Sequence, residues 1–342
     1  MNKVDIIAVD LGKHSYHIHE QDERGHPLLR KKFNRAGLLQ HLAVIEPCTV
    51  VMEACGGAHF MAQQVASLGH TPKLIAPHLV RPYVKSNKND FADAEAICEA
   101  ASRPTMRFVP VKNQHQQALG MLNSIRDAFI KERTAAVNRI HAGLLEVGVS
   151  LAPGFKSVKE VPALLEAASF DGLIKKLLQG LYDHYVYLDY QVKALDKEVE
   201  SQVAEDDLAS RLMTIPGVGP ITSSVLAAEL GDGRQFKCGR SYSASIGLVP
   251  KQHSTGGKTV LLGISKRGDR NQRRLFVQCA RVYLMHLDKQ EGRLVDWVRK
   301  LLAGHRHSNL VVCALANKLA RIAWSIAANH TEFDAGPSAM NA

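Results

Sequence analysis

Residues 5–34 read DIIAVDLGKHSYHIHEQDERGHPLLRKKFN. Its first apolar run ends at Gly12, which predicts a short buried strand. The segments SYHIHEQDERG and PLLRKKFN predict two more strands that turn at Arg24-Gly25. The chain is therefore expected to begin with three consecutive strands.

The segments that follow alternate between helical spacing and strand-like apolar runs. The predicted helices and strands are, in chain order, a helix at 35–45, a strand at 48–57, a helix at 58–69 and a strand at 71–77. Three strands followed by such an alternation predict a mixed α/β sheet, and the order suits an RNase H-like layer.

The character of the sequence changes after Pro110. Two long Leu-, Lys- and Glu-rich stretches, about 114–149 and about 170–203, have helical spacing, with a break near Ala152-Pro153-Gly154. The second stretch is long enough for one arm of a coiled-coil hairpin, and it fits a helix of an ordinary bundle equally well. From about Leu208 the chain has a Gly-Pro cluster, then a very basic segment, and then amphipathic helices.

Composition narrows the class of protein. The 342 residues are 46% hydrophobic and 22% charged, which is typical of a globular protein and excludes disorder as the main state. The formal net charge of +10 favours a polyanionic partner. Six scattered cysteines form no C-x-x-C pair, so they indicate free thiols in a reducing cytosol. The start of the chain does not read as a signal peptide, and Lys318 and Arg321 make the apolar stretch 310–329 too charged for a membrane span.

Carboxylates mark the first candidate site. Asp10 and Glu53 each end a predicted strand next to glycines, and Asp90 and Asp93 lie three apart on one side of a predicted helix. Four carboxylates that meet in space repel one another unless a hard divalent cation such as Mg²⁺ neutralises them. The alternatives are a helix-capping role for Asp90 and solvated loop positions for Asp10 and Glu53.

The opening AVDLG also fits the phosphate-binding turn of sugar-kinase and actin-like ATPases. That fold needs a second α/β half with another Asp-Gly turn. The second half of this chain is predicted to be helical and basic, so the kinase interpretation is a distant rival.

A Gly-x-Gly turn between two helices marks the second candidate site. The stretch LMTIPGVGPITSSVLAAEL, residues 212–230, predicts a helix-hairpin-helix motif. Gly217 and Gly219 would let backbone amides approach a DNA phosphate at the start of the following helix. The simpler alternative is a turn that only connects two helices.

A basic segment with a hydroxyl at its centre marks the third candidate site. Residues 251–274 contain seven Lys or Arg residues against the single acid Asp269, and they contain no Phe, Trp or Tyr, so phosphate contacts are expected rather than base stacking. Ser254 and Thr255 precede Gly256-Gly257, which predicts a hydroxyl on a flexible loop. One interpretation is that this hydroxyl attacks a DNA phosphate. The alternative is that Ser-Thr-Gly-Gly forms a loop with no chemical role, which is the more frequent case for such a sequence. The expected cationic or proton-handling partners are Lys251, His253, Lys258, Lys266, Arg267, Arg270, Arg273 and Arg274.

Taken together, these segments resemble the DEDD transposases of the insertion-sequence one-ten family, and its eleven-eleven subgroup in particular, which are bridge-RNA-guided DNA recombinases. The resemblance runs from about Val4 to Asn329. It rests on AVDLGKHSYHIHEQDERG, VVMEACGGAHF, NKNDFADAEAICEA, TIPGVGPITSSVLAAELGD and GLVPKQHSTGGKTVLLGISKRGD in this order and spacing.

The resemblance implies three domains, with a site in the first and in the third. A RuvC-like, RNase H-fold domain at 1–112 would hold Mg²⁺ on the acidic tetrad Asp10, Glu53, Asp90 and Asp93. A coiled-coil segment at 113–205 would lead to a mainly helical transposase domain at 206–342 with a nucleophilic serine. That serine falls on Ser254, and Thr255 is the second candidate.

The resemblance also implies the partners. DNA at the element ends and at the target, a structured guide RNA, and further copies of the chain in a dimer or tetramer are expected, in a cytoplasmic, nucleoid-associated bacterial protein. The tetrad and the serine would come from different subunits. The rivals are a Mg²⁺-dependent junction resolvase without a covalent intermediate and a non-enzymatic nucleic-acid-binding protein.

Overall fold

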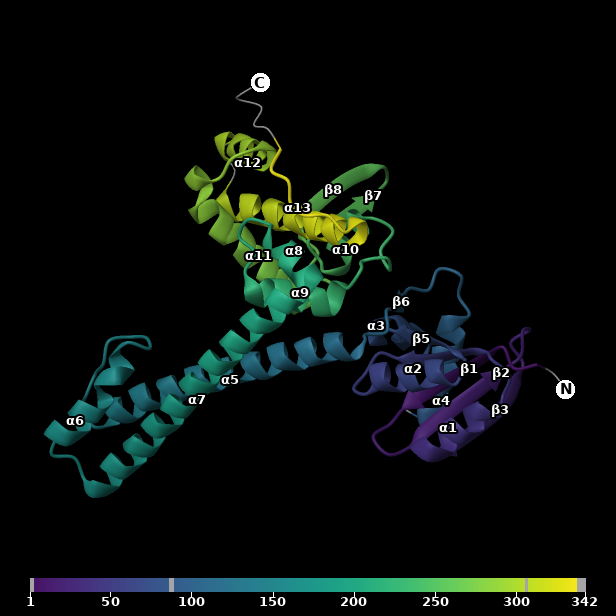
Figure 1. Ribbon diagram of the computed structural model, residues 1–342, viewed down its shortest axis with the longest axis horizontal. Coiled ribbons are helices and arrows are strands. Elements are labelled where there is room, and N and C mark those ends of the chain that lie inside the picture. The colour runs from purple at the N-terminus through teal and green to yellow at the C-terminus, as the bar shows by residue number, and fades with distance from the viewer. Residues whose placement is uncertain (1–2, 86–88, 305–306, 337–342) are drawn as a thin grey trace. The chain divides into compact units, whose positions relative to one another are not determined.

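The computed structural model describes residues 3–85, 89–304 and 307–336 (Figure 1). Asn87 and Lys88, which belong to the NKND motif quoted above, lie outside the described residues. The chain divides into two compact units, residues 1–114 and 115–342. The expected domain boundary at 112 stays a prediction. The further division of the second unit at 205 stays a prediction.

A six-stranded mixed sheet forms the centre of the first unit. Its strand order is β3-β2-β1-β4-β5-β6, in which β1, β4 and β5 run parallel while β2, β3 and β6 are antiparallel to their neighbours. The mixed α/β sheet predicted from the sequence is confirmed. The two-residue β6 was not predicted, because so short a strand leaves no periodic signal. The strands are β1 (Ile6–Leu11), β2 (Tyr16–Gln21), β3 (Pro27–Phe33), β4 (Thr49–Glu53), β5 (Thr71–Ile75) and β6 (Phe108–Val109).

Helices cover both faces of this sheet. Ile7, Val9 and Met52 belong to one apolar cluster with residues of α1 (Arg35–Ala43) and α2 (Ala58–Ser67). Ala8 and Val51 belong to a second cluster with residues of α4 (Asp90–Ala101). Because side chains alternate along a strand, even positions of β1 and odd positions of β4 face α4. The short helices α3 (Pro77–Val80) and η1 (Arg81–Tyr83) connect β5 toward α4.

Two long helices, α5 (Gln114–Glu146) and α7 (Gly172–Glu205), pair in antiparallel fashion in the second unit. Arg126 contacts Asp196 at 2.5 Å and Arg133 contacts Asp189 at 2.6 Å, so seven residues forward on α5 match seven back on α7. Four of the six buried residues of α7 recur every seven positions, at Leu178, Tyr185, Val192 and Val199, and this repeat keeps one stripe against a partner helix. The link between the two helices holds η2 (Ser157–Glu160) and α6 (Val161–Ala167).

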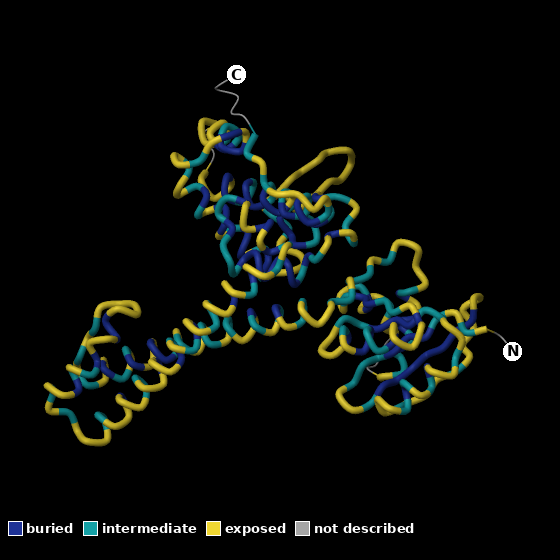
Figure 2. Tube along the Cα trace, in the orientation of Figure 1, coloured by how far each residue is buried: buried dark blue, intermediate teal, exposed yellow. Residues whose placement is uncertain are grey.

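A helical core completes the second unit and presents a β-hairpin. Its elements are α8 (Asp207–Met213), α9 (Pro220–Leu230), α10 (Gly239–Ser245), β7 (Pro250–Thr255), β8 (Lys258–Ile264), α11 (Arg270–Met285), η3 (Leu287–Lys289), α12 (Arg293–Ala303) and α13 (Ser308–Asn329). By length and composition α13 is apolar enough to cross a membrane, so Lys318 and Arg321 do not make it too charged as predicted, but nine of its residues are buried in this core. That burial is what the central helix of a folded domain requires. Figure 2 shows the contrast between this buried core and the exposed hairpin of β7 and β8.

Candidate active site and nucleic-acid interface

The carboxylates of the first unit lie on the α4 side of the sheet. Asp10 is in β1 at an even position, and Glu53 ends the neighbouring parallel strand β4 at an odd position. Both therefore point from the sheet toward the layer that contains α4. The carboxyl ends of the two strands reach the same edge of the sheet, which is why the sequence signal of a strand ending in an acid before glycine located them.

The first turn of α4 supplies the other two carboxylates. Asn89 caps this helix, since its side chain accepts a hydrogen bond from the Phe91 N–H at 3.0 Å. The capping alternative for Asp90 is therefore wrong: Asp90 and Asp93 both lie inside the first turn. One oxygen each from Asp10, Asp90 and Asp93 can be chosen so that all three lie within 4.8 Å of one another.

Glu53 lies within the electrostatic reach of this cluster. Burial, together with the charges of Asp10 and Asp93, raises the pKa of the Glu53 carboxyl above its ordinary value. Burial and the charges of Glu53 and Asp10 likewise raise the pKa of the Cys55 thiol. Burial is the larger cause of both shifts, and the smaller part is due to nearby negative carboxylates, whose charge an added cation would offset.

The donor set fits a hard divalent cation. Three carboxylates whose oxygens converge within 4.8 Å, with a fourth close enough to be perturbed, are the oxygen-only ligands that such ions prefer. Asp90 is exposed, and Asp10 and Asp93 are half-buried, so the cluster is open on one side to a phosphate group. The fold thus brings together three of the four acids that the sequence singled out, and Glu53 lies near enough for the charges of Asp10 and Asp93 to raise its pKa.

His17 was not singled out by the sequence, although it borders this cluster. It pairs with Asp10 in the β1–β2 ladder, and its Nδ1 lies 3.5 Å from Oδ2 of Asp90. Its ring packs edge-on against Phe91 with centroids 4.8 Å apart. The alternation in YHIHEQ carries the signal that was missed, because it places His17 and His19 on the face opposite Ile18.

In the second unit, the Gly-x-Gly turn joins α8 to α9 as the motif predicted. Gly217 has a φ of +85°, and a Cβ there would lie 2.6 Å from the backbone oxygen of Cys279 in α11. The close packing of the turn on α11 is thus sufficient to require glycine at this position. Gly219 has an extended backbone and nothing within 4 Å of a Cβ position, and it immediately precedes Pro220 at the start of α9. Of the two glycines, Gly219 has room for the approach of a phosphate.

The hydroxyl pair lies on a strand, which corrects the predicted flexible loop. Ser254 and Thr255 are the last two residues of β7, and Gly256-Gly257 makes the turn into β8. Both glycines have positive φ, 57° and 78°. The common two-residue hairpin turn needs positive φ at both central residues, and glycine adopts it without strain. Every residue of β7 is exposed.

The hairpin register separates the two hydroxyls. Ser254 lies opposite Thr259, and its Oγ accepts a hydrogen bond from Nε2 of Gln252 at 2.7 Å. Thr255 lies opposite Lys258, and His253 lies on the same face of the hairpin as these two. Of the two hydroxyls that the sequence singled out, the alternation of side chains thus places Thr255, and not Ser254, on the face that carries His253 and Lys258.

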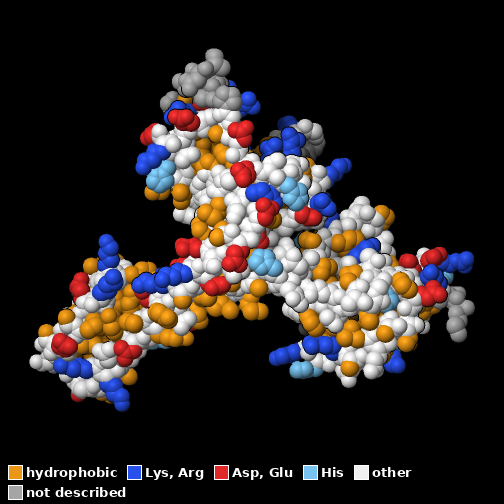
Figure 3. All heavy atoms as spheres, in the orientation of Figure 1, with side chains coloured by type: hydrophobic (Ala, Val, Ile, Leu, Met, Phe, Trp, Pro, Cys, Tyr) orange, Lys and Arg blue, Asp and Glu red, His pale blue; other side chains and the backbone are white. Residues whose placement is uncertain are grey.

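The basic residues around the hairpin divide into exposed and engaged ones. Figure 3 shows Lys and Arg side chains gathered over β7 and β8 on the visible face. Arg273 is engaged, because its Nη1 donates to the backbone oxygens of Ile246 at 2.9 Å and Arg267 at 3.0 Å. Gly247 is equally confined, since a Cβ there would lie 2.2 Å from the oxygen of Arg267. The exposed members of the predicted set are Lys251, His253, Lys258, Lys266, Arg267, Arg270 and Arg274.

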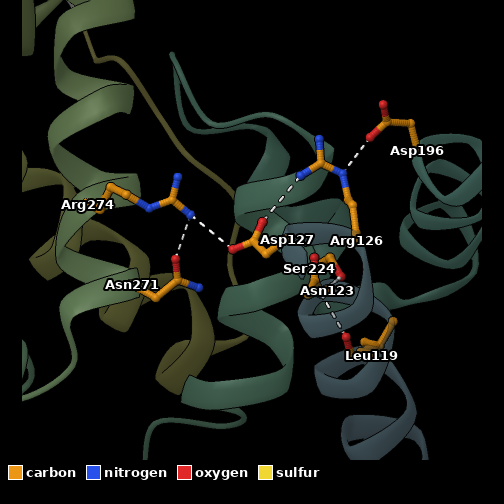
Figure 4. A network of polar contacts seen from close by, with 8 residues as sticks. All are labelled: Leu119, Asn123, Arg126, Asp127, Asp196, Ser224, Asn271 and Arg274. Carbon is orange, nitrogen blue, oxygen red and sulfur yellow. Dashed lines mark hydrogen bonds and ion pairs between the residues drawn. The ribbon is translucent and has the colours of Figure 1, made fainter. Parts of the chain in front are cut away.

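Arg274 is exposed yet paired, as Figure 4 shows. Its Nη2 lies 3.3 Å from Asp127 of α5 and 2.7 Å from Asn271. Asp127 also lies 3.6 Å from Arg126, which contacts Asp196 of α7. This chain of ion pairs connects α11 to both long helices, so Arg274 supports the architecture of the second unit as well as its basic surface.

Comparison with known proteins identifies the family. The family model described as "Transposase IS116/IS110/IS902 family" matches residues 209–295, and a DEDD model of IS110 type, described as "Transposase", matches residues 7–148. The chain is 53% identical to the transposase for insertion sequence element IS1328 of Yersinia enterocolitica, over 97% of this chain and 99% of that protein.

Two further relatives extend over nearly the whole length. A probable family 20 transposase of Pseudomonas aeruginosa is 39% identical over 96% of this chain and 98% of its own. The transposase for insertion sequence element IS1111A of Coxiella burnetii is 38% identical over 98% of this chain and 93% of its own. The first family match covers the helix-hairpin-helix segment and the β7–β8 hairpin, and the second covers all four acids.

Proposed function

The chain belongs to the IS116/IS110/IS902 family of insertion-sequence transposases, and we propose that it cuts and exchanges DNA strands through a covalent bond between a β7 hydroxyl and a backbone phosphate. Family membership makes the protein an enzyme that acts on DNA, which removes the non-enzymatic alternative. The observation that carries the proposal is the convergence of Asp10, Asp90 and Asp93 in a chain of this family.

We assign a RuvC-like, RNase H fold to the first unit. The strand order β3-β2-β1-β4-β5, with antiparallel β2 and β3 followed by parallel β1, β4 and β5, supports this assignment. The position of Asp10 in the central strand β1 and of Glu53 at the end of β4 supports it as well. The α5–α7 pair, with buried residues of α7 every seven positions, would be the coiled-coil segment.

Asp10, Glu53, Asp90 and Asp93 would hold Mg²⁺. When bound, that ion would supply positive charge to phosphate oxygens and lower the pKa of a coordinated hydroxyl. The chain itself supplies the geometry: β1 and β4 fix two carboxylates at one edge of a rigid sheet, and the capped first turn of α4 presents the other two. The open side of the cluster leaves room for the DNA backbone.

Ser254 is the proposed nucleophile. Its Oγ would attack a backbone phosphorus, forming an Oγ–P bond while the bond from phosphorus to one deoxyribose oxygen breaks. The serine proton leaves to solvent or a nearby base, and the departing deoxyribose oxygen takes up a proton. Attack by the hydroxyl of another DNA end then restores a phosphodiester and releases the serine, so strand exchange needs no external energy source.

The covalent bond is the property to test. The protein is incubated with Mg²⁺, guide RNA and DNA of the element ends, and denaturing electrophoresis then reports protein that is linked to DNA. Wild type is expected to form the adduct, and Ser254→Ala is expected to lose it while keeping DNA binding. Strand cleavage without an adduct in wild type would favour the hydrolytic resolvase alternative, in which activated water replaces serine.

Thr255 is the second candidate for the nucleophile, and the hairpin register favours it. It shares its face of β7–β8 with His253 and Lys258, which offer a proton acceptor and a positive charge, whereas Ser254 does not. Thr255→Ala is therefore the matched variant of Ser254→Ala. Loss of the adduct in Thr255→Ala alone would transfer the role to Thr255.

The proposed partners follow from the same function. The exposed basic residues around the hairpin and the Gly219 turn would contact phosphates of DNA and of a structured guide RNA, in a nucleoid-associated protein. We propose a dimer or tetramer in which the carboxylates of one copy act with the hydroxyl of another. Mixing Asp10→Asn with Ser254→Ala protein then restores part of the adduct, because one pairing of subunits has both groups intact. No restoration would place both groups in one subunit.

A further inference from the structure

His17 is a buried side chain that touches the carboxylate cluster from the sheet. It is the second residue of β2, paired with Asp10 on one side and Lys32 on the other. Its side chain is only 6% exposed, whereas that of Asp90 is 58% exposed. The Phe91 ring, edge-on at 4.8 Å, restricts the rotation of the imidazole. The imidazole is thus fixed by the sheet and by α4 together.

Asp90 needs such a fixed neighbour more than the other acids do. It stands at the beginning of α4, immediately after the cap Asn89, and it is the exposed member of the group that also contains Asp10 and Asp93. An exposed carboxylate has several accessible rotamers and loses side-chain entropy when it binds an ion. A buried partner 3.5 Å from Oδ2 favours the rotamer in which Asp90 points toward the sheet.

We propose that His17 is a positioning residue for the carboxylate cluster: its imidazole holds Asp90 in the orientation that binds a divalent cation. The Nδ1 atom faces Oδ2 of Asp90 at 3.5 Å, which leaves Oδ1 for the ion. Groups that orient metal ligands in this way typically contribute about 10–100-fold to metal affinity. This inference rests on the proposed cation site, and it adds a residue that lies outside the four acids.

Two variants of nearly equal shape isolate the donor. His17→Asn keeps an N–H close to the position of Nδ1, and His17→Leu has almost the same shape with no donor. Both lose the same packing against Phe91, so a difference between them reports the contact with Asp90. His17→Phe is a further donor-free variant, which keeps the volume of the ring if the smaller side chains impair folding.

The measurement is the binding of Mn²⁺ alone to the full-length protein, by electron paramagnetic resonance of the free ion, without DNA. His17→Leu and His17→Phe are expected to bind Mn²⁺ about 10–100-fold more weakly than wild type, and His17→Asn to stay within a few-fold. His19→Phe is the matched control, since His19 faces the same way on β2 but interacts with Arg30, Glu95 and Lys85 instead. It should bind Mn²⁺ like wild type.

The failure of this inference is separable from the failure of the cation site. If His17→Leu and His17→Phe bind Mn²⁺ like wild type while Asp10→Asn does not, the site exists and the positioning role of His17 is wrong. If Asp10→Asn also binds like wild type, the carboxylates do not form the site. In an Asp90→Asn background, His17→Leu should change the affinity no further, because the carboxylate that it orients is gone. A further loss of the same size there would overturn the proposed route through Asp90.

Discussion

The carboxylate cluster of the first unit and the hydroxyl-bearing hairpin of the second are built in different ways. Asp10 and Glu53 project from parallel strands whose neighbouring residues are almost fully buried, and α4 covers the same face. Ser254 and Thr255 lie on a two-stranded hairpin that is exposed along β7, and it also exposes Val260, Leu261 and Leu262 of β8. An isolated two-stranded hairpin is only marginally stable in water.

The carboxylate site and the hairpin should therefore depend on different things. The sheet edge fixes carboxylate geometry inside one folded unit, so ion binding should not need DNA. The hairpin exposes apolar and basic side chains together, so its conformation should depend on what it binds. Substitutions in the first unit should therefore act on ion affinity, and substitutions near the hairpin should act on nucleic-acid binding or on its packing support.

The largest effect is expected at the cluster itself. Asp10→Asn keeps the size of the side chain but removes a charged ligand, so Mn²⁺ affinity should fall by more than about 100-fold, beyond the loss expected when only an orienting group is removed. The folded state should be retained or slightly stabilised, because repulsion of Glu53 and Asp93 is reduced. Ion binding by titration and thermal unfolding together check this. If Asp10→Asn binds Mn²⁺ like wild type, the expectation that substitutions at the carboxylate cluster act on ion affinity is contradicted.

The second effect concerns the packing of the Gly-x-Gly turn on α11 in the second unit. Gly217→Ala adds a Cβ 2.6 Å from the oxygen of Cys279 at a left-handed residue, so the second unit should lose about 1–3 kcal/mol of stability. Gly219→Ala is the matched control, with open space around its Cβ, and it should unfold like wild type. Both tryptophans, Trp297 and Trp324, lie in the second unit, so their fluorescence in urea reports its unfolding. Equal midpoints for the two variants would contradict this role of Gly217.

The sequence predicted the first unit better than the hairpin, and the reason is the range of the interactions. Strand ends beside glycines and a spacing of three residues along a helix are local signals, and they singled out Asp10, Glu53, Asp90 and Asp93. The role of His17 depends on the register between β1 and β2 and on which face of β2 its side chain occupies. Alternation places His17 opposite Ile18, but this is informative only once Ile18 is known to face the core.

The hairpin was misjudged because a two-residue glycine turn and a longer loop have the same composition. Only the pairing of Ser254 with Thr259 and of Thr255 with Lys258 shows which side chains share a face. The engagement of Arg273 with backbone oxygens at 246 and 267 was likewise unpredictable, since it depends on the fold of a loop around Gly247. Basic composition predicts a polyanionic partner, but it does not show which Lys and Arg side chains are available to contact that partner.

The third effect separates free cations from engaged ones. Replacing both Arg267 and Arg270 by alanine should lower the dependence of log K on log salt by about one for each lost phosphate contact, with similar weakening on all DNA sequences. Arg273→Ala should instead lower the stability of the second unit, because it leaves backbone oxygens without their donor. DNA binding at several salt concentrations and urea unfolding distinguish the two outcomes. An unchanged salt slope in the double variant would remove these arginines from the interface.

The smallest effect is a pH dependence confined to the first unit. His19 is buried, and its Nδ1 has no hydrogen-bond partner within the described part of the chain. Burial first, and then the positive charge of Arg30, lower the pKa of His19 below its ordinary value of 6.5, although Glu95 opposes this. Because the unfolded chain then binds the proton more readily, the stability that neutral His19 contributes is fully present above about pH 6.5 and declines as the pH falls below it.

Hydrogen exchange of the β1 and β2 amides measures this effect, since both tryptophans report the other unit. Corrected for the intrinsic pH dependence of exchange, protection in wild type should be lower at about pH 5.5 than at about pH 7.5. His19→Phe fills the same space without a titrating group, so the difference between the two pH values should shrink in that variant. The amides of α11, in the second unit, should respond alike in both proteins. If the change in protection of the β1 and β2 amides between the two pH values is the same in wild type and in His19→Phe, the pH dependence comes from another group and not from His19.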